Sequence, residues 1–370
     1  MQPAINPTAI ADLLTANPLK VAYEAVQWSK NIFGLAHKNA AGRMFRLLFP
    51  ESEHKGSGSE ERAISPDLLE YFRQRYQALL EQDWKDAEAG VYPVSLLFDT
   101  PWDEFFRFYP AVWLDAPKTW QKGTAKRYQE FSSEIETEGY PKYYLQNFHY
   151  QTDGYLSDSS ANLYDLQVEL LFGGMADPMR RRILPLLKSG LAESSGAGLE
   201  RVKVLDVACG TGRTLRQLRA AFPKAALYGV DLSPAYLRKA NQLLSQNPGD
   251  LPQLLQANAE ALPYQDAYFE AVSSVFLFHE LPPQARQSVI NECFRVLQPG
   301  GTFVICDSIQ LSDSAELSPM MQGFSKTFHE PYYTSYIHDD FTQRLEQAGF
   351  QNISSQAYFM SKYFTAQKPV

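Results

Sequence analysis

The stretch that decides the fold is "VKVLDVACGTGRT", which runs from Val202 to Thr214. An aliphatic run ends in an aspartate, and a short loop with two glycines and a helix-like segment follow it. The order strand, glycine turn, helix is a general device for holding nucleotide-like ligands. The helix N-terminus offers free N–H groups, and glycine lets the backbone come close to the ligand.

The residues around the two glycines distinguish three kinds of ligand loop. A P-loop has a lysine before Ser or Thr in the pattern G-x-x-x-x-G-K-[ST], whereas Arg213 follows Gly212 here. A dinucleotide loop has Gly or Ala, for close helix–strand packing, where Leu215 stands. The carboxylate of Asp206 would repel a pyrophosphate but could pair with a cationic ligand such as an amino acid. The stretch is therefore atypical of loops that bind ATP or NAD.

From Val202 onward, short aliphatic runs alternate with amphipathic helical stretches. The predicted strands are Val202–Val207, Ala226–Val230, Gln253–Gln256, Ala271–Phe276 and Thr302–Cys306. Near the C-terminus, "FQNISSQAYFMSKYF" predicts two closing strands. Because strands that alternate with helices form parallel βαβ units, we predict an α/β fold with a Rossmann-like doubly wound sheet.

The 370 residues are enough for more than one domain. We predict a mainly helical N-terminal domain over residues 1–140, a bridging or lid segment over 141–199, and the doubly wound domain over 200–370. "SPDLLEYFRQRYQALLEQDW" is the clearest N-terminal helix, with Ser65 as its cap. "KSGLAESSGAGLE", at the end of the bridge, has the composition of a linker.

Four stretches resemble, in order and spacing, the motifs of one enzyme family. They are "VLDVACGTG", "LYGVDLS", "QANAEALPYQDAYFEAVSS" and "RVLQPGGTFVICD", within about residues 200 to 310. This series is similar to the class I S-adenosylmethionine (SAM)-dependent methyltransferases, in the UbiE-like or type 11 group. The resemblance implies the seven-stranded methyltransferase type of sheet, SAM as cofactor, and transfer of a methyl group.

The resemblance also implies the cofactor contacts. Asp231 would accept both ribose hydroxyls, and Asn258 stands near the adenine amino group, where the family often has Asp. Leu232 and Ala259 would flank the adenine ring. The full set of implied contacts is Asp206, Ala208, Gly210, Gly212, Asp231, Leu232, Asn258 and Ala259. For Asp206 and Asp231 the structural alternative is capping or turn formation.

Three loops carry the candidate catalytic residues, since crevices in open α/β sheets lie at the carboxyl ends of the strands. Each residue would orient the acceptor or act as a general base, or it would only hold its loop by hydrogen bonds. The candidates are His279 and Glu280 in "FLFHELPP", His149 in "YYLQNFHYQTDGYLS", and His329 and Glu330 in "FHEPYYTSY". The tyrosines of the last two loops, Tyr144, Tyr150, Tyr155, Tyr332 and Tyr333, are candidates for the acceptor pocket.

Composition narrows the acceptor to a class. The net charge of -8 and the lack of an "NPPY"-like motif argue against a nucleic-acid substrate. Aromatic residues make up 13% of the chain, which suits a small or medium-sized apolar or aromatic acceptor. The basic cluster Arg180–Arg182 is predicted to be a solvated helix end. Two alternatives remain: a SAM-binding regulatory or scaffold protein, and a transferase for another group of SAM, such as aminopropyl.

Metal binding and membrane insertion are not expected from the sequence. The three cysteines form no CxxC pair, and no acidic cluster resembles the metal site of catechol-type methyltransferases, so we predict neither a metal nor a disulfide. The N-terminal "MQPAINPTAIADLL" lacks the pattern of a secretory signal, and no run of about 18 apolar residues could span a bilayer. We expect a cytoplasmic protein. The sequence does not indicate its oligomeric state.

Overall fold

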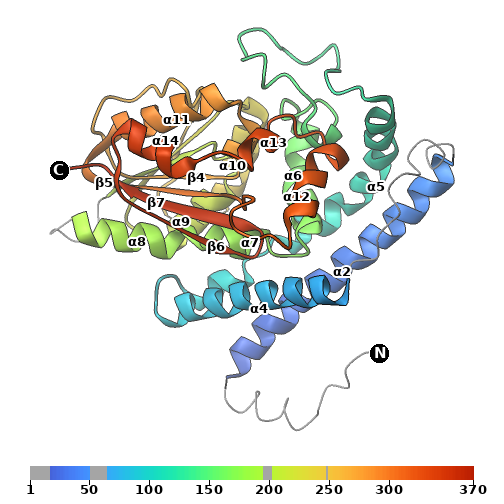
Figure 1. Cartoon of the computed structure of the whole chain (residues 1–370), viewed down its shortest axis with the longest axis horizontal. Helices are drawn as coiled ribbons and strands as arrows, with labels where there is room; N and C mark the ends of the chain where they lie inside the picture. The colour runs from blue at the N-terminus through green and yellow to red at the C-terminus, as the bar shows by residue number, and fades with distance from the viewer. Residues whose placement is uncertain (1–16, 51–64, 195–201, 247–248) are drawn as a thin grey trace.

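The computed structural model describes residues 17–50, 65–194, 202–246 and 249–370 (Figure 1). A seven-stranded sheet has the strand order β3-β2-β1-β4-β5-β7-β6. The first five strands in this order run parallel, and β7 is antiparallel to both β5 and β6. The strands are β1 (Lys203–Val207), β2 (Ala226–Asp231), β3 (Gln253–Gln256), β4 (Phe269–Val275), β5 (Leu297–Ser308), β6 (Gln351–Tyr358) and β7 (Ser361–Gln367). The predicted Rossmann-like α/β fold and all seven strand positions are confirmed.

Helices cover both faces of the sheet, so most residues of the central strands β1, β4 and β5 are buried. In β1, Val204 packs into one buried cluster with α8 and α9, whereas Leu205 packs into a second cluster with α11 and α14. Figure 1 shows α8 on one side of the sheet and α11 and α14 on the other. The helices of this half are α8 (Ile183–Ser194), α9 (Arg213–Ala221), α10 (Pro234–Leu244), α11 (Pro283–Val296), α12 (Ser318–Thr327), α13 (Tyr333–Tyr336) and α14 (Phe341–Ala348).

Helix α8 corrects the linker predicted at "KSGLAESSGAGLE". Residues 188–194 continue the helix, while residues 195–201, with the predicted domain boundary at 199, lie outside the described residues. Leu187 and Leu191 are fully buried, and a Cβ atom at Gly190 would stand 2.2 Å from Thr302 Oγ1 of β5. The small residues that suggested a linker include one that lets α8 lie close to the sheet.

The N-terminal region is helical, as predicted, and shares a core with the sheet. Tyr23, Leu79, Met179 and Tyr363 all belong to one buried cluster. The predicted cap is confirmed, since Ser65 Oγ accepts a hydrogen bond from the Leu68 N–H at 3.1 Å. The described helices before the sheet are α2 (Pro18–Leu48), α4 (Pro66–Glu88), α5 (Trp102–Ala125), α6 (Asp158–Leu171) and α7 (Ala176–Arg181), and a 3₁₀ turn spans Val94–Phe98. The predicted N-terminal stretch "MQPAINPTAIADLL" lies outside the described residues.

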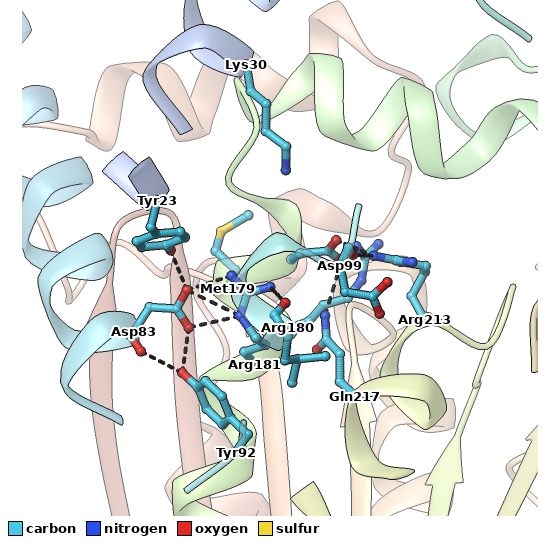
Figure 2. Close-up of polar contacts among 12 residues, drawn as sticks. Tyr23, Lys30, Asp83, Tyr92, Asp99, Met179, Arg180, Arg181, Arg213 and Gln217 are labelled. Carbon is cyan, nitrogen blue, oxygen red and sulfur yellow. Dashed lines mark hydrogen bonds and ion pairs between the residues drawn. The ribbon is translucent and has the colours of Figure 1, made fainter. Parts of the chain in front are cut away.

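The prediction that Arg180–Arg182 form a solvated helix end is wrong, because all three side chains are buried. Arg181 donates to both carboxylate oxygens of Asp83, from Nε at 3.0 Å and from Nη2 at 2.6 Å. The hydroxyls of Tyr23 and Tyr92 donate to the same carboxylate, and Figure 2 shows the three groups converging on it. Buried charges need such partners, and Asp83 lies 98 residues away from Arg181 in the sequence.

A second buried ion pair joins α7 to the helix that follows the glycine loop. The Arg213 guanidinium donates to the Asp177 carboxylate and to the backbone oxygen of Asp99 at 2.9 Å. Burial opposes ionisation of Asp177, but Arg213 and Arg180 hold its pKa below its ordinary value. Thr211 of the loop also donates to Asp165 of α6 at 2.9 Å. The helices before the sheet therefore fix the glycine loop in place.

Candidate active site

A cavity opens at the carboxyl ends of β1, β2 and β4, where the predicted crevice lies. It measures about 760 Å³ including its mouth. Six of the eight predicted cofactor residues line it: Ala208, Gly210, Asp231, Leu232, Asn258 and Ala259. Six aromatic side chains line it as well: Tyr143, Tyr144, Tyr155, Tyr164, Tyr236 and Phe276.

The glycine loop has the left-handed backbone that glycine favours. Gly210 and Gly212 have φ of 54° and 83°. A Cβ atom at Gly210 would meet no neighbour within 4 Å, whereas one at Gly212 would stand 3.0 Å from the Ala240 Cβ of α10. Gly210 is therefore needed for its backbone conformation beside the cavity. Gly212 is needed also for close helix packing.

Leu215, which departs from the dinucleotide pattern, is accommodated by a glycine in the neighbouring strand. Leu215 is fully buried, and a Cβ atom at Gly229 of β2 would lie 2.7 Å from its Cδ1. The close contact between helix α9 and the sheet is therefore made with the large residue on the helix and the small residue on the strand. No local pattern in the sequence paired these two positions.

Asp231 at the end of β2 lies on the cavity wall and holds the glycine loop. Its Oδ2 accepts from the Gly210 N–H at 2.8 Å, and its Oδ1 accepts from the Ser233 N–H at 2.8 Å. Burial raises its pKa, and these N–H donors counteract the shift. Each carboxylate oxygen keeps a further lone pair, so two ribose hydroxyls could still donate to it.

Asp206 and Gly212 are the two predicted cofactor residues that are not part of the cavity wall. Asp206 is 1% exposed, and its Oδ1 accepts from Ser273 Oγ of β4 at 2.7 Å. Burial raises the pKa of Asp206 to about 7. Its pairing with a cationic ligand stays a prediction, since its carboxylate contacts the neighbouring strand instead.

Four of the five candidate catalytic residues lie close together around Glu280. Glu280 lines the cavity, and its Oε1 accepts from the Tyr155 hydroxyl at 2.5 Å. His149 Nε2 lies 2.7 Å from Glu330 Oε1, and His279 Nε2 lies 3.9 Å from Glu280 Oε1. Asp307 was not among the predicted residues. It lies at the end of β5, and an acid at the carboxyl end of a parallel strand could have marked it as a candidate. Asp307 Oδ1 lies 2.6 Å from His279 Nδ1.

The electrostatics of this group follow from burial and from its own charges. Burial raises the pKa of Glu280 to about 7, and the neighbouring Glu330 adds to the shift. For His279, burial acts in the opposite direction, but Asp307 raises its pKa to about 10. His149 behaves similarly, since the effect of Glu330 outweighs that of burial and raises its pKa.

The other predicted residues lie outside the cavity wall, except Tyr144 and Tyr155. His329 Nε2 lies 2.7 Å from Gln146 Oε1, and its ring stacks on Tyr128. The hydroxyl of Tyr332 accepts from Gln146, that of Tyr333 contacts Ser308, and Tyr150 packs beside Gly123. The sequence analysis missed four aromatic wall residues: Tyr143, Tyr164, Tyr236 and Phe276. Tyr143 begins a predicted crevice loop and Phe276 ends a predicted strand, whereas Tyr164 and Tyr236 had no signal beyond the overall aromatic content.

Known proteins resemble the part of the chain that contains this cavity. Residues 204–301 match a family model described as a methyltransferase domain. An uncharacterized methyltransferase of Synechocystis sp. is 32% identical over 156 residues, which cover 42% of this chain and 70% of that protein. The demethylmenaquinone methyltransferase of Thermotoga maritima is 28% identical, over 56% of this chain and 90% of that protein. A solved structure of Haemonchus contortus phosphoethanolamine N-methyltransferase 2 with S-adenosyl-L-methionine has a TM-score of 0.39 and 16% identity, over 50% of this chain and 53% of that chain.

The matched range begins at β1 and contains the glycine loop, Asp231 and Asn258. The resemblance that the four motifs indicated is therefore confirmed, and with it SAM as the cofactor. The chain belongs to the class I SAM-dependent methyltransferases.

Proposed function

We propose that the protein transfers the methyl group of SAM to a small or medium-sized acceptor with an apolar or aromatic body. The observation that carries this proposal is a second cavity, of about 1040 Å³ including its mouth, which shares the wall residue Tyr164 with the cofactor cavity. Its walls include Val112, Trp113 and Trp120 of α5. An aromatic-walled space of this kind fits the body of an apolar acceptor. The net charge of -8 supports a small molecule over a nucleic acid.

The reaction needs little covalent chemistry from the protein. A lone pair of the acceptor attacks the methyl carbon of SAM and forms the new bond, while the carbon–sulfur pair stays on sulfur and gives S-adenosylhomocysteine. Where the acceptor atom carries a proton, that proton passes to water. The chain's part is to align the acceptor with the methyl group and to exclude bulk water. The tyrosines around Glu280 are placed for both tasks.

The motif residues hold the donor in this proposal. Asp231 accepts the ribose hydroxyls, Asn258 faces the adenine amino group, and Leu232 and Ala259 enclose the ring. The backbone at Gly210 leaves room for the amino-acid part of SAM, since nothing lies within 4 Å of its missing side chain. All five positions lie on one continuous cavity wall.

Replacing Asp231 by Ala is expected to weaken SAM binding about 100-fold, because two hydrogen bonds to a charged acceptor are lost. Asp231→Asn keeps one accepting oxygen and should fall between Asp231→Ala and the wild type. Calorimetric titration with SAM measures both variants. The exposed Asp250→Ala serves as the matched control and should bind as the wild type does. An unchanged affinity of Asp231→Ala would contradict the assigned donor site.

The acceptor class is tested with SAM labelled in its methyl group. A cell extract is divided into an organic-soluble and a water-soluble fraction, and each is incubated with the purified chain. We expect labelled product from the organic-soluble fraction. Label only in water-soluble products would overturn the apolar acceptor, and no label with intact SAM binding would overturn methyl transfer.

A bulky residue in the second cavity tests where the acceptor binds. Ala116→Trp fills space between α5 and α6 and should raise the KM for the labelled acceptor at least about tenfold, since its binding surface is lost. SAM affinity should not change. Leu114→Trp, on the exposed side of the same helix, is the control. Equal KM values in both variants would place the acceptor elsewhere.

A further inference from the structure

Three potential ligand residues lie close together, one of them on the wall of each cavity. His149 comes from the 3₁₀ turn Phe148–Tyr150, Glu280 from the turn Phe278–Glu280, and Glu330 from the loop after α12. One ligand atom of each residue lies within 4.8 Å of the other two. Glu280 lines the cofactor cavity and His149 lines the second cavity.

Glu330 is buried beside one imidazole, His149, but accepts no hydrogen bond within the described residues. Its side chain is 0% exposed. His149 Nε2 lies 2.7 Å from Oε1, yet the pair does not have the aligned geometry of an N–H···O bond. A buried carboxylate that accepts no hydrogen bond is costly, so its position points to a further positive partner beside His149.

We propose that His149, Glu280 and Glu330 bind one divalent transition-metal cation. Imidazole nitrogen and carboxylate oxygen are both ligands of zinc, and carboxylate oxygen also suits manganese. Atoms within 4.8 Å of one another can converge, with small side-chain rotations, on one ion at about 2.0–2.2 Å from each. Three protein ligands leave a position open, as in catalytic metal sites. This proposal replaces the absence of metal expected from the sequence.

The groups around the cluster suit an outer shell that orients its ligands. The Tyr155 hydroxyl donates to Glu280 Oε1 at 2.5 Å, and His279, held by Asp307, lies 3.9 Å from the same oxygen. Such partners fix the position of metal-binding carboxylates. The region holds three carboxyl groups and two imidazoles, so its acidic groups outnumber its basic ones and favour a cation. The carboxyl groups are Glu280, Asp307 and Glu330, and the imidazoles are His149 and His279.

A cation here would face both the methyl donor and the acceptor. Its open position could bind an oxygen, nitrogen or sulfur atom of the acceptor and withdraw charge from it, which favours loss of its proton. This role rests on the proposed function, whereas binding of the cation does not. The competing occupant is a positively charged nitrogen of the acceptor itself.

Cobalt(II) is a suitable probe, because its visible absorption reports coordination by protein ligands. The full chain, treated with chelator, is titrated with Co²⁺ and followed by absorption and calorimetry without SAM or acceptor. We expect one equivalent to bind and Zn²⁺ to displace it. Glu330→Gln and His149→Asn should each weaken binding at least about tenfold. Asn suits position 149, where φ is 52°.

The control variant is His329→Gln, since His329 lies in the same loop as Glu330 but outside the cluster. It should bind Co²⁺ as the wild type does, and melting curves of all variants check folding. If one cluster variant does not fold, the other still decides the result. No absorption band in the wild type, or equal affinity in a folded cluster variant, would overturn the metal site. Methyl transfer that persists in that case would leave the proposed function intact.

Discussion

Asp83→Ala is expected to lower the free energy of unfolding by about 3–5 kcal/mol, because it leaves a buried guanidinium without its counterion. Arg181 is 2% exposed and donates to Asp83 from two nitrogens. The hydroxyls of Tyr23 and Tyr92 would lose the same carboxylate acceptor. Chemical denaturation, followed by fluorescence, measures the loss.

Two further variants separate the ion pair from other effects of the substitution. Glu88→Ala removes an exposed carboxylate from the same helix, α4, and should change stability by less than about 0.5 kcal/mol. Asp83→Leu combined with Arg181→Met replaces the pair by apolar side chains and should lose less than the sum of its single variants. Additive losses would show that the two residues do not depend on each other.

Asp206→Asn is expected to stabilise the protein without ligand at pH 8. Burial raises the pKa of Asp206 to about 7, whereas an unfolded aspartate titrates near 3.9. The folded state therefore binds the proton more tightly, and the wild type loses stability as the pH rises from about 4 to about 7. The difference of three pKa units corresponds to about 4 kcal/mol. Asn has no such charge, and its side-chain oxygen can still accept from Ser273.

Denaturation of the wild type and Asp206→Asn at several pH values measures this effect. The stability gain of the variant should be small near pH 4, grow up to pH 7 and then stay constant. Glu88→Gln, an exposed substitution, should show no such growth. If the stability gain of the variant does not change with pH, burial does not raise the pKa of Asp206 in the folded protein.

The parallel sheet was predictable because each of its strands is encoded by residues that are neighbours in the sequence. Each strand appears as a short apolar run, and βαβ units allow few arrangements. The glycine loop, Asp231 and Asn258 could be placed because they follow particular strands, whose carboxyl ends must share one edge of the sheet. Bounds shifted by a few residues: β5, for example, begins at Leu297 instead of Thr302.

The group of residues around Glu280 was only partly predictable, because these residues come from loops far apart in the chain. His149 and Glu330 were both candidates, but nothing in the sequence placed them 2.7 Å apart. Asp307 and Tyr164 were missed, since a single acid at a strand end and a single tyrosine in a helix have many ordinary uses. The burial of Arg181 and Arg182 was missed because their carboxylate partners, Asp83 and Asp86, lie on the distant helix α4.

The stretch Val202–Thr214 has features that its local sequence determines and others that depend on tertiary packing. By itself, the sequence determined the sheet, the glycine turn and the cofactor class, because strand and loop patterns depend on neighbouring residues. Only the tertiary structure decided that Gly229 makes room for Leu215 and that Asp206 faces Ser273. It also decided that His149, Glu280 and Glu330 lie close together, because such contacts depend on how separate segments pack.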